Sequence, residues 1–275
     1  MARQQLGQHF LADPGWREKI ARAIGVSRHA IAASSLEDKK AEFCWIEIGA
    51  GHGEMTQVLA ATGAPVYAIE LDVSLARSLD RLVGKFPNLV VVPGDVLATD
   101  LAALADGRRI RVYGNLPYYI TSPILHHLFT FADVIDEIHI VIQNEVALRL
   151  AAKAGSRAYG YLSVVTQLYT RPELVFRIPR GAFRPAPEVS SALVTLRLPG
   201  ERAKLALRDE VSFLNFVKLC FLQKRKTLVN NLRLLATPDA VRKNLAALNL
   251  RPDSRAEQLS VSQLVSLQSS LKPGG

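Results

Sequence analysis

The feature that most constrains the fold is a regular alternation of short apolar runs with longer helical patterns through the first two thirds of the chain. The apolar runs are rich in β-branched and aromatic residues and predict strands at 43–48, 65–70, 89–93, 110–114 and 137–143. Helical periodicity predicts helices at 14–25, 54–62, 73–84, 121–130 and 144–153. This alternation is typical of an α/β fold, in which a mostly parallel sheet is covered on both faces.

The pattern changes in the last third of the chain. Two more strand candidates, 173–178 and 192–198, follow each other with little helix between them and predict an antiparallel pair at one sheet edge. After a charged linker at 198–209, the remaining periodicity is helical only, at 210–222, 224–235, 238–247 and 258–270. We therefore expect two domains, an α/β domain at 1–199 and a smaller all-helical domain at 200–275.

The positive charge is concentrated in the predicted helical domain. The net charge is +9, and residues 200–275 hold 13 Lys and Arg against 6 Asp and Glu, whereas residues 1–199 hold 21 against 19. A basic appendage on a near-neutral body favours a polyanionic partner, although a solvated helical surface remains the alternative. Two distant cysteines, six scattered histidines and no run of roughly 18 apolar residues predict a cytoplasmic protein without disulfide, metal site or membrane span.

A glycine-rich turn follows the first predicted strand. Gly49, Gly51 and Gly53 allow the backbone to turn sharply and to approach a ligand closely, at the sheet edge where α/β folds bind ligands. The dinucleotide fingerprint requires a further glycine at the position of Glu54. An acid there suits the start of a helix and repels a pyrophosphate. The turn therefore favours a cofactor without phosphate over a nicotinamide dinucleotide.

Acidic residues stand at the ends of the next two predicted strands. Glu70 is placed to accept hydrogen bonds from both hydroxyls of a ribose, and Asp95 is placed to accept one from an adenine amino group. Either acid alone is better explained as a solvated residue at the end of a strand. Three consecutive strand ends with suitable groups predict a nucleoside-type cofactor pocket in a Rossmann-like sheet.

The fourth strand ends in the tetrad Asn115-Leu116-Pro117-Tyr118. A simple turn is the alternative, but the position beside the predicted pocket favours chemistry. The N6 amine of adenine is a poor nucleophile, because its lone pair is delocalised into the ring. The Asn115 side-chain oxygen and the Pro117 carbonyl are predicted to hold the amine hydrogens, and Tyr118 to stack on an extruded base. Positioning then supplies most of the catalysis.

At these residues the sequence resembles the ribosomal RNA adenine dimethyltransferases that modify two adjacent adenines near the 3′ end of small-subunit rRNA. The segments that carry the resemblance are Gln8-His9-Phe10-Leu11, Glu47-Ile48-Gly49-Ala50-Gly51, Ala68-Ile69-Glu70-Leu71-Asp72, Asn115-Leu116-Pro117-Tyr118, Gln143-Asn144-Glu145-Val146-Ala147, Tyr159-Gly160-Tyr161-Leu162-Ser163, Phe183-Arg184-Pro185-Ala186-Pro187, Gln223-Lys224-Arg225-Lys226-Thr227-Leu228 and Arg255-Ala256-Glu257-Gln258-Leu259-Ser260. They span nearly the whole chain.

The resemblance implies an S-adenosylmethionine-dependent methyltransferase that acts as a monomer on a partly assembled small ribosomal subunit. It implies that the S-adenosylmethionine pocket is lined by His9, Leu11, Gly49, Gly51, Glu70, Asp95 and Asn115. The family usually has Asn at the position of His9. Phe183 resembles the aromatic residue that packs on the target base, with a core phenylalanine as the alternative.

Lys224, Arg225 and Lys226 are predicted to open a helix, where their charge opposes the helix dipole, so phosphate contact would explain them. Two other functions remain possible. One is methylation of adenine in large-subunit rRNA by a related enzyme. The other is a non-catalytic ribosome-assembly or transcription factor built on the methyltransferase fold.

Overall fold

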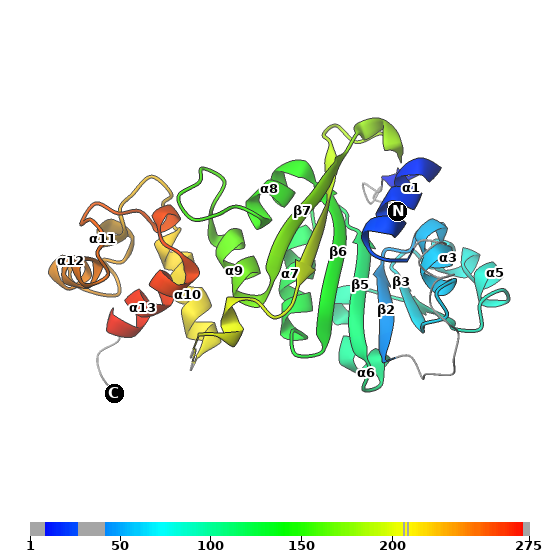
Figure 1. Ribbon diagram of the computed structural model, residues 1–275, viewed down its shortest axis with the longest axis horizontal. Coiled ribbons are helices and arrows are strands. Elements are labelled where there is room, and N and C mark those ends of the chain that lie inside the picture. Colours follow the sequence, from blue (N-terminus) through cyan, green and yellow to red (C-terminus); the bar gives the residue numbers. More distant parts are fainter. Residues whose placement is uncertain (1–8, 27–41, 206, 208, 272–275) are drawn as a thin grey trace, which may run out of the picture. The chain divides into compact units, whose positions relative to one another are not determined.

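The structure is a computed structural model that describes residues 9–26, 42–205, 207 and 209–271 (Figure 1). Contacts between Cα atoms divide the chain into two compact units. The first comprises residues 1–147 and 173–198, and the second comprises residues 148–172 and 199–275. The second unit thus includes residues 148–172, which the sequence pattern assigns to the α/β domain. The predicted boundary at 199/200 remains a prediction about which parts fold independently.

A seven-stranded sheet in the order β4-β3-β2-β5-β6-β9-β7 forms the centre of the first unit. The strands are β2 (Phe43–Ile48), β3 (Val66–Glu70), β4 (Leu89–Pro93), β5 (Arg109–Asn115), β6 (Ile135–Gln143), β7 (Arg171–Ile178) and β9 (Ser191–Arg197). β2 to β6 pair in parallel, and β9 pairs antiparallel with β6. The predicted α/β fold with a mostly parallel sheet is confirmed.

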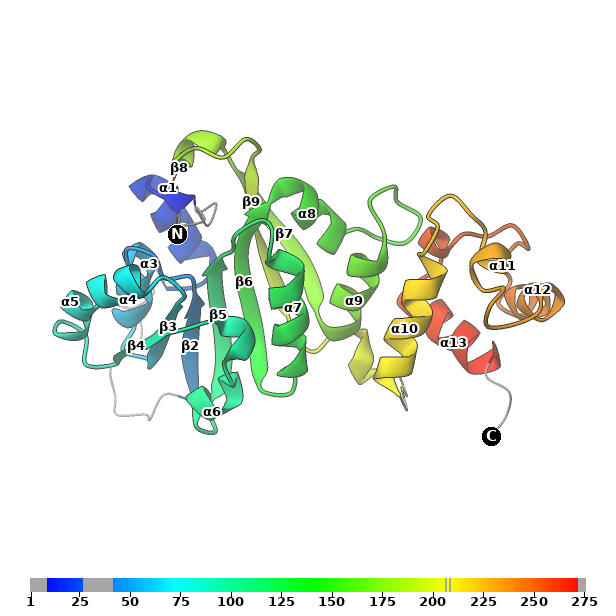
Figure 2. The same ribbon diagram turned by 180° about the vertical axis from the view of Figure 1, so that it is seen from behind.

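Helices cover both faces of this sheet (Figures 1 and 2). They are α1 (Pro14–Ala23), α3 (Glu54–Ala60), α4 (Val73–Ser78), α5 (Asp80–Val83), α6 (Leu101–Ala105), α7 (Thr121–Thr130) and α8 (Asn144–Leu150). α1 begins as predicted, with Pro14 in the first turn and the Asp13 carboxylate accepting a hydrogen bond from the Trp16 N–H at 3.1 Å. The single helix predicted at 73–84 is two short helices, which meet at Leu79.

A second, two-stranded sheet was not predicted. β1 (Phe10–Leu11) pairs antiparallel with β8 (Phe183–Arg184), which follows a 3₁₀ turn at Arg180–Ala182. Further main-chain bonds join the same two segments, because Ala12 and Asp13 both donate to the Ala182 carbonyl. This pairing draws the N-terminal segment to the carboxyl ends of the parallel strands.

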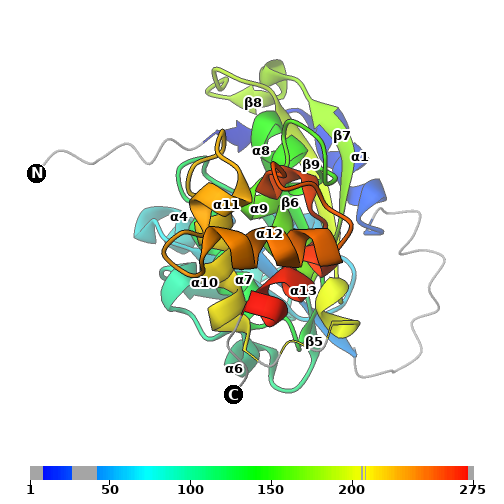
Figure 3. The same cartoon turned by 90° about the vertical axis from the view of Figure 1, so that its left-hand side faces the viewer.

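The second unit is helical (Figure 3). Its helices are α9 (Tyr161–Tyr169), α10 (Glu210–Cys220), α11 (Leu228–Asn231), α12 (Pro238–Ala247) and α13 (Val261–Leu271). α9 packs against α10 and α13, which is why residues 148–172 belong to this unit. The all-helical appendage is confirmed, but the helix predicted at 224–235 is reduced to the four residues of α11. Among the described residues, no helix has the length and apolar character needed to cross a membrane.

Candidate active site

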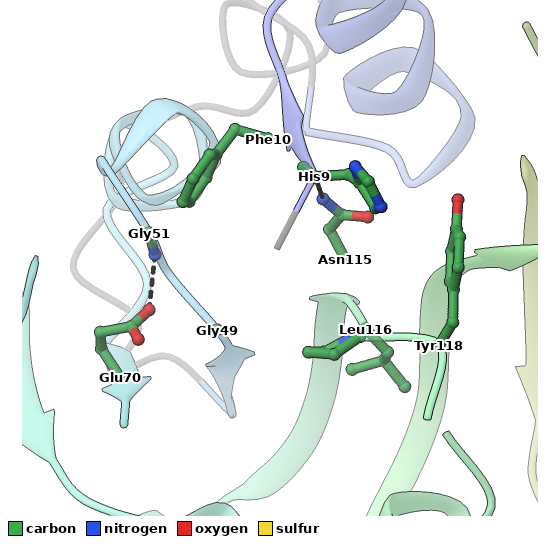
Figure 4. A pocket seen from close by; sticks show the side chains of 9 residues that line it. His9, Phe10, Gly49, Gly51, Glu70, Asn115, Leu116 and Tyr118 are labelled. Atoms are coloured by element: carbon green, nitrogen blue, oxygen red, sulfur yellow. Dashed lines mark hydrogen bonds between the residues drawn. The ribbon is translucent and has the colours of Figure 1, made fainter. Parts of the chain in front are cut away.

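Three adjoining hollows lie at the carboxyl ends of β2, β3 and β5, and Gly49 lines all three. The first, shown in Figure 4, is lined by His9, Phe10, Gly49, Gly51, Glu70, Asn115, Leu116, Pro117 and Tyr118. Asp95 lines the second and Leu11 the third. The structure therefore brings together every cofactor and catalytic residue predicted from the sequence.

The conformation of the glycine turn and its contact with Phe10 require glycine at position 51. Gly51 has a φ of +57°, and a Cβ atom there would lie 2.9 Å from the ring of Phe10. Its N–H donates to Glu70 Oε2 at 2.8 Å, as Figure 4 shows. A side chain at this position would collide with Phe10 and strain the backbone. Phe10 lines two of the hollows. It was not predicted as a site residue, although its neighbours His9 and Leu11 were.

Glu70 is 1% exposed, and each of its carboxylate oxygens already accepts one hydrogen bond. Oε2 accepts from Gly51, and Oε1 accepts from the Asp72 N–H at 3.0 Å. Each carboxylate oxygen has a second lone pair, so capacity remains for the two hydroxyls of a ribose. Glu70 thus organises the glycine turn, a role that its position in the sequence did not reveal.

The second hollow is mainly apolar and suits a flat ring. Ile48, Ile69, Val96 and Ile124 line it together with Asp95. Asp95 is exposed and caps a 3₁₀ turn, its Oδ1 accepting a hydrogen bond from the Leu97 N–H at 2.9 Å. Mainly apolar walls beside the exposed Asp95 carboxylate fit the predicted adenine-binding end of the cofactor site.

Glu47 was not predicted as a site residue, yet it lines the third hollow with Leu11 and Asn115. Its side chain is 2% exposed, and within the described part of the chain its Oε2 atom has no hydrogen-bond partner. Burial raises the pKa of Glu47 from 4.5 to about 8, and the charges of Glu54 and Glu70 add to the rise while the nearby Thr56 hydroxyl opposes it. A buried carboxylate of this kind favours a ligand that carries positive charge. S-adenosylmethionine, with its sulfonium and ammonium groups, fits this requirement.

Asn115 is oriented before any substrate arrives. Its Nδ2 donates to the main-chain carbonyl of His9 at 2.7 Å, the bond drawn in Figure 4. The N–H side of the amide is thereby engaged, which leaves Oδ1 as the acceptor on the pocket side. The sequence prediction that Asn115 offers an oxygen to an amine therefore has a geometric basis.

Pro117 requires a correction. Its carbonyl accepts hydrogen bonds from the Ile120 N–H and from Thr121 Oγ1, both at 3.2 Å, where α7 begins. A carbonyl oxygen has two lone pairs, so both are in use. The structure therefore does not support Pro117 as the second acceptor for the amine. Leu116, which lines the same hollow, contributes the neighbouring carbonyl of the tetrad.

Tyr118 is half-buried, and contacts of its hydroxyl and of its ring fix the position of the side chain. Its hydroxyl bonds to Ser191 Oγ at 2.9 Å, and its ring centroid lies 5.6 Å from that of His9. Burial raises the pKa of Tyr118, so it remains a neutral phenol at physiological pH. The His9 ring bonds through Nδ1 to the Pro185 carbonyl at 2.9 Å. His9 therefore shapes the pocket through its main chain and its ring packing.

The structure bears on two groups of residues that were predicted to contact RNA. Phe183 is 1% exposed and belongs to a hydrophobic cluster with Leu11 and Ile20, so the core alternative is the one observed. Lys224, Arg225 and Lys226 do not open a helix. They form an exposed turn before Thr227, which is the N-cap of α11 because its hydroxyl accepts a hydrogen bond from the Asn230 N–H at 3.4 Å. Their charges therefore do not oppose a helix dipole from within a first helical turn, and phosphate contact stays a prediction.

Comparison with known proteins identifies close relatives of the whole chain. A family model described as ribosomal RNA adenine dimethylase matches residues 1–272. The chain is similar to a protein of Xanthomonas campestris pv. campestris (strain B100) named ribosomal RNA small subunit methyltransferase A, with 38% identity over 97% of this chain and 95% of the relative. A protein of the same name from Koribacter versatilis (strain Ellin345) is 37% identical over 98% of this chain and 94% of the relative.

Solved structures support the fold. A dimethyladenosine transferase from Plasmodium falciparum matches with a TM-score of 0.73 and 22% identity, over 94% of this chain and 96% of that chain. The 23S rRNA methyltransferase ErmE matches with a TM-score of 0.71 and 25% identity, over 96% of this chain and 100% of that chain. The fold similarity therefore includes both the sheet and the helical appendage.

Proposed function

The chain belongs to the ribosomal RNA adenine dimethylase family, and we propose that it dimethylates the N6 amine of adenine in small-subunit rRNA. The observation that carries the proposal is the Asn115 amide, whose Nδ2 donates to the His9 carbonyl and whose oxygen is thereby left as the acceptor in a hollow that Tyr118 also lines. The relatives named for the small subunit are 37–38% identical, whereas the 23S enzyme is 25% identical. This difference supports the small subunit over the large one.

The cofactor is S-adenosylmethionine, which supplies an electrophilic methyl group when bound. Asp95 and the apolar side chains around it hold the adenine, and the spare lone pairs of Glu70 accept the ribose hydroxyls. Glu47 balances positive charge at the other end of the site. A group of three or more metal-ligating side chains is absent among the described residues, and the prediction that no metal takes part remains untested.

The pocket residues position the amine. Asn115 Oδ1 and a main-chain carbonyl of the tetrad accept the two amine hydrogens, which turns the nitrogen lone pair toward the methyl donor. Tyr118, fixed by Ser191, supplies the stacking face for the extruded base. The methylated amine releases its proton readily, so a strong general base is not required.

The finer parts of the proposal concern the substrate and its setting. We propose that the targets are two adjacent adenines in a hairpin loop near the 3′ end of the rRNA, because an unpaired base leaves its stack at low cost. The substrate is a partly assembled subunit, so the protein acts during ribosome biogenesis in the cytoplasm. The resemblance to the family supports a monomer, which light scattering would test.

A non-catalytic assembly factor is the second candidate, and one experiment separates the two. Ribosomal RNA from cells that lack the gene is compared by mass spectrometry with rRNA from cells that carry the wild type or Asn115→Ala. We expect dimethyladenosine only with the wild type. Equal dimethyladenosine with all three would contradict the proposal, and a growth defect rescued equally by Asn115→Ala would support the non-catalytic role.

A further inference from the structure

The segment that joins β7 to β9, residues 177–191, is tied to the pocket at three places. The Pro185 carbonyl accepts a hydrogen bond from the His9 ring, Ser191 Oγ bonds to the Tyr118 hydroxyl, and β8 pairs with β1. Because a carbonyl can only accept, Nδ1 of His9 carries the proton. The 177–191 segment is therefore bonded to residues that line the pocket.

Three arginines of this segment are exposed and held by neutral acceptors. Arg177 donates to Ser190 Oγ at 3.2 Å, and Arg180 Nε donates to the Pro187 carbonyl at 2.7 Å. Arg184 donates to the carbonyls of Gly181 and Phe183 at 3.1 and 2.9 Å. Each guanidinium has five donors, so most of them remain free for a ligand. The side chains are thus positioned while their charge is not compensated.

Seven other arginines of the described chain differ from these three. Arg22, Arg108, Arg109, Arg197, Arg202, Arg242 and Arg251 each form an ion pair with a carboxylate. None of the ion pairs found among the described residues involves Arg177, Arg180 or Arg184, and Glu188 is the one acid within 177–191. Concentrated, unpaired positive charge on a rigid segment favours an anionic partner.

Strand register places one of these three arginines, Arg184, beside the pocket. Arg184 lies directly opposite Phe10 in the β1–β8 pair, and directly opposed residues of an antiparallel pair project from the same face. The Phe10 ring forms part of the wall of the first hollow. Arg184 therefore stands at the rim of the pocket, with Arg177 and Arg180 on the same segment.

We propose that Arg177, Arg180 and Arg184 form a phosphate-binding surface for the RNA strand that delivers the target base. The proposal rests on the proposed function and assigns part of RNA recognition to the methyltransferase unit itself. Arginine forks bind phosphate oxygens in pairs, and contacts to the backbone fix the register of a strand without reading its bases. The surface would hold the nucleotides that flank an extruded adenine.

The test is RNA binding at several salt concentrations by the triple variant R177Q/R180Q/R184Q. Loss of three contacts to phosphates of single-stranded or duplex RNA should make the plot of the logarithm of the association constant against the logarithm of the salt concentration less steep, by about 2 to 3 units of slope. At 0.15 M salt, RNA binding should weaken about a hundredfold. The matched control R77Q/K85Q/R108Q removes the same charge from the same unit, at α4, after α5 and before β5. We expect its salt slope to change by less than one unit.

Further measurements separate this surface from the catalytic site. Calorimetry should find unchanged S-adenosylmethionine affinity in the glutamine triple variant, and single-turnover methyl transfer at saturating RNA should keep its rate. Weaker cofactor binding with an unchanged salt slope would assign the arginines to the cofactor carboxylate and overturn the proposal. Equal losses of RNA binding and of salt slope in the control variant would also overturn the proposal.

If R177Q/R180Q/R184Q fails to fold, R177K/R180K/R184K provides a second test because it retains the charge. It should keep the salt slope of RNA binding while its RNA affinity falls. Wild-type protein that binds rRNA but methylates none would instead contradict the proposed function.

Discussion

Asn115 shows how one residue is prepared for catalysis by a distant part of the chain. The His9 carbonyl lies 106 positions away in sequence, yet it holds the Asn115 amide at 2.7 Å. An acceptor that is already oriented needs no reorganisation when the amine arrives, and this is the source of its catalytic value. The same bond closes the N-terminal segment over the pocket, so Asn115 has a second, structural task.

Substitution of Asn115 should therefore affect turnover more than cofactor affinity. We expect Asn115→Ala to lower the single-turnover rate on the order of a hundredfold or more at saturating cofactor, the usual scale for one lost polar contact in a transition state. S-adenosylmethionine affinity, measured by calorimetry, should change by less than tenfold. Asn115→Asp keeps an acceptor but loses the bond to His9, so an equally slow Asp variant would identify orientation as the larger effect. A near-normal rate in Asn115→Ala would remove it from the catalytic residues.

Glu47 makes the stability of the ligand-free protein depend on pH. Burial raises its pKa from 4.5 to about 8, so the folded protein binds more protons than the unfolded chain between these values. The free energy of unfolding therefore falls as pH rises through this window. Glu47→Gln should be more stable than the wild type at pH 8, by up to about 1.4 kcal/mol for each unit of pKa shift that is realised.

Urea unfolding of both proteins at pH 5 and pH 8, without cofactor, measures this effect. The difference between them should shrink at pH 5, where Glu47 is largely neutral in the fold. Tyr118→Phe offers a control, because its phenol does not titrate in this range. If the free energies of unfolding of the wild type and Glu47→Gln depend on pH in the same way, then Glu47 is ionised in the cofactor-free protein. Its surroundings would then stabilise the buried carboxylate.

The strands and the glycine turn could be predicted because their signals are local. Periodicity within five to nine residues determines each strand; Gly49 directly follows β2, and Glu70 is the last residue of β3. The β1–β8 pair could not be predicted, since two residues pair with two others more than 170 positions away. Phe183 was ambiguous for the same reason. Glu47 did leave a signal, an acid inside an apolar strand, but only burial shows its consequence.

The start of α11 could have been predicted from its N-cap residue, although helical periodicity extended the predicted helix back to Lys224. Thr227 followed by Asn230 fits an N-cap, and the helix begins after it, not at Lys224. The side chains of Arg225 and Lys226 are exposed, whereas the Lys224 ammonium donates to the Arg157 carbonyl at 2.8 Å within the same unit. Exposure leaves phosphate contact open for this turn even though the dipole argument fails.

Neutralising this turn should weaken RNA binding through charge alone. We expect Arg225→Gln with Lys226→Gln to reduce the salt slope by roughly one unit for each lost phosphate contact, while cofactor affinity stays the same. Arg242→Gln with Lys243→Gln is the matched control on α12, where Arg242 already pairs with Asp239 at 2.9 Å. Filter binding from 50 to 300 mM salt measures both. Identical slopes for the two double variants would make the turn an ordinary solvated surface.

At the scale of the whole molecule, charge and chemistry are divided between parts of the chain. The pocket is built entirely from the first unit, whereas residues 200–275 carry 13 Lys and Arg against 6 Asp and Glu. A pocket that takes one base needs few phosphate contacts. The remaining basic surface is explained by a substrate that presents many phosphates, and a ribosomal subunit is such a substrate.

The size of the substrate should therefore decide the rate. We expect methyl transfer to a partly assembled small subunit to be at least about tenfold faster, at subsaturating concentration and physiological salt, than transfer to the isolated hairpin, because the hairpin offers only the contacts near the pocket. Tritiated methyl incorporation into subunits from a strain that lacks the enzyme, followed by nucleoside analysis, measures the first rate, and a synthetic hairpin gives the second. Lower salt should narrow the gap, since weak electrostatic contacts then suffice. Equal rates at physiological salt, or dimethyladenosine in large-subunit rRNA alone, would show that the basic appendage does not select a small ribosomal subunit.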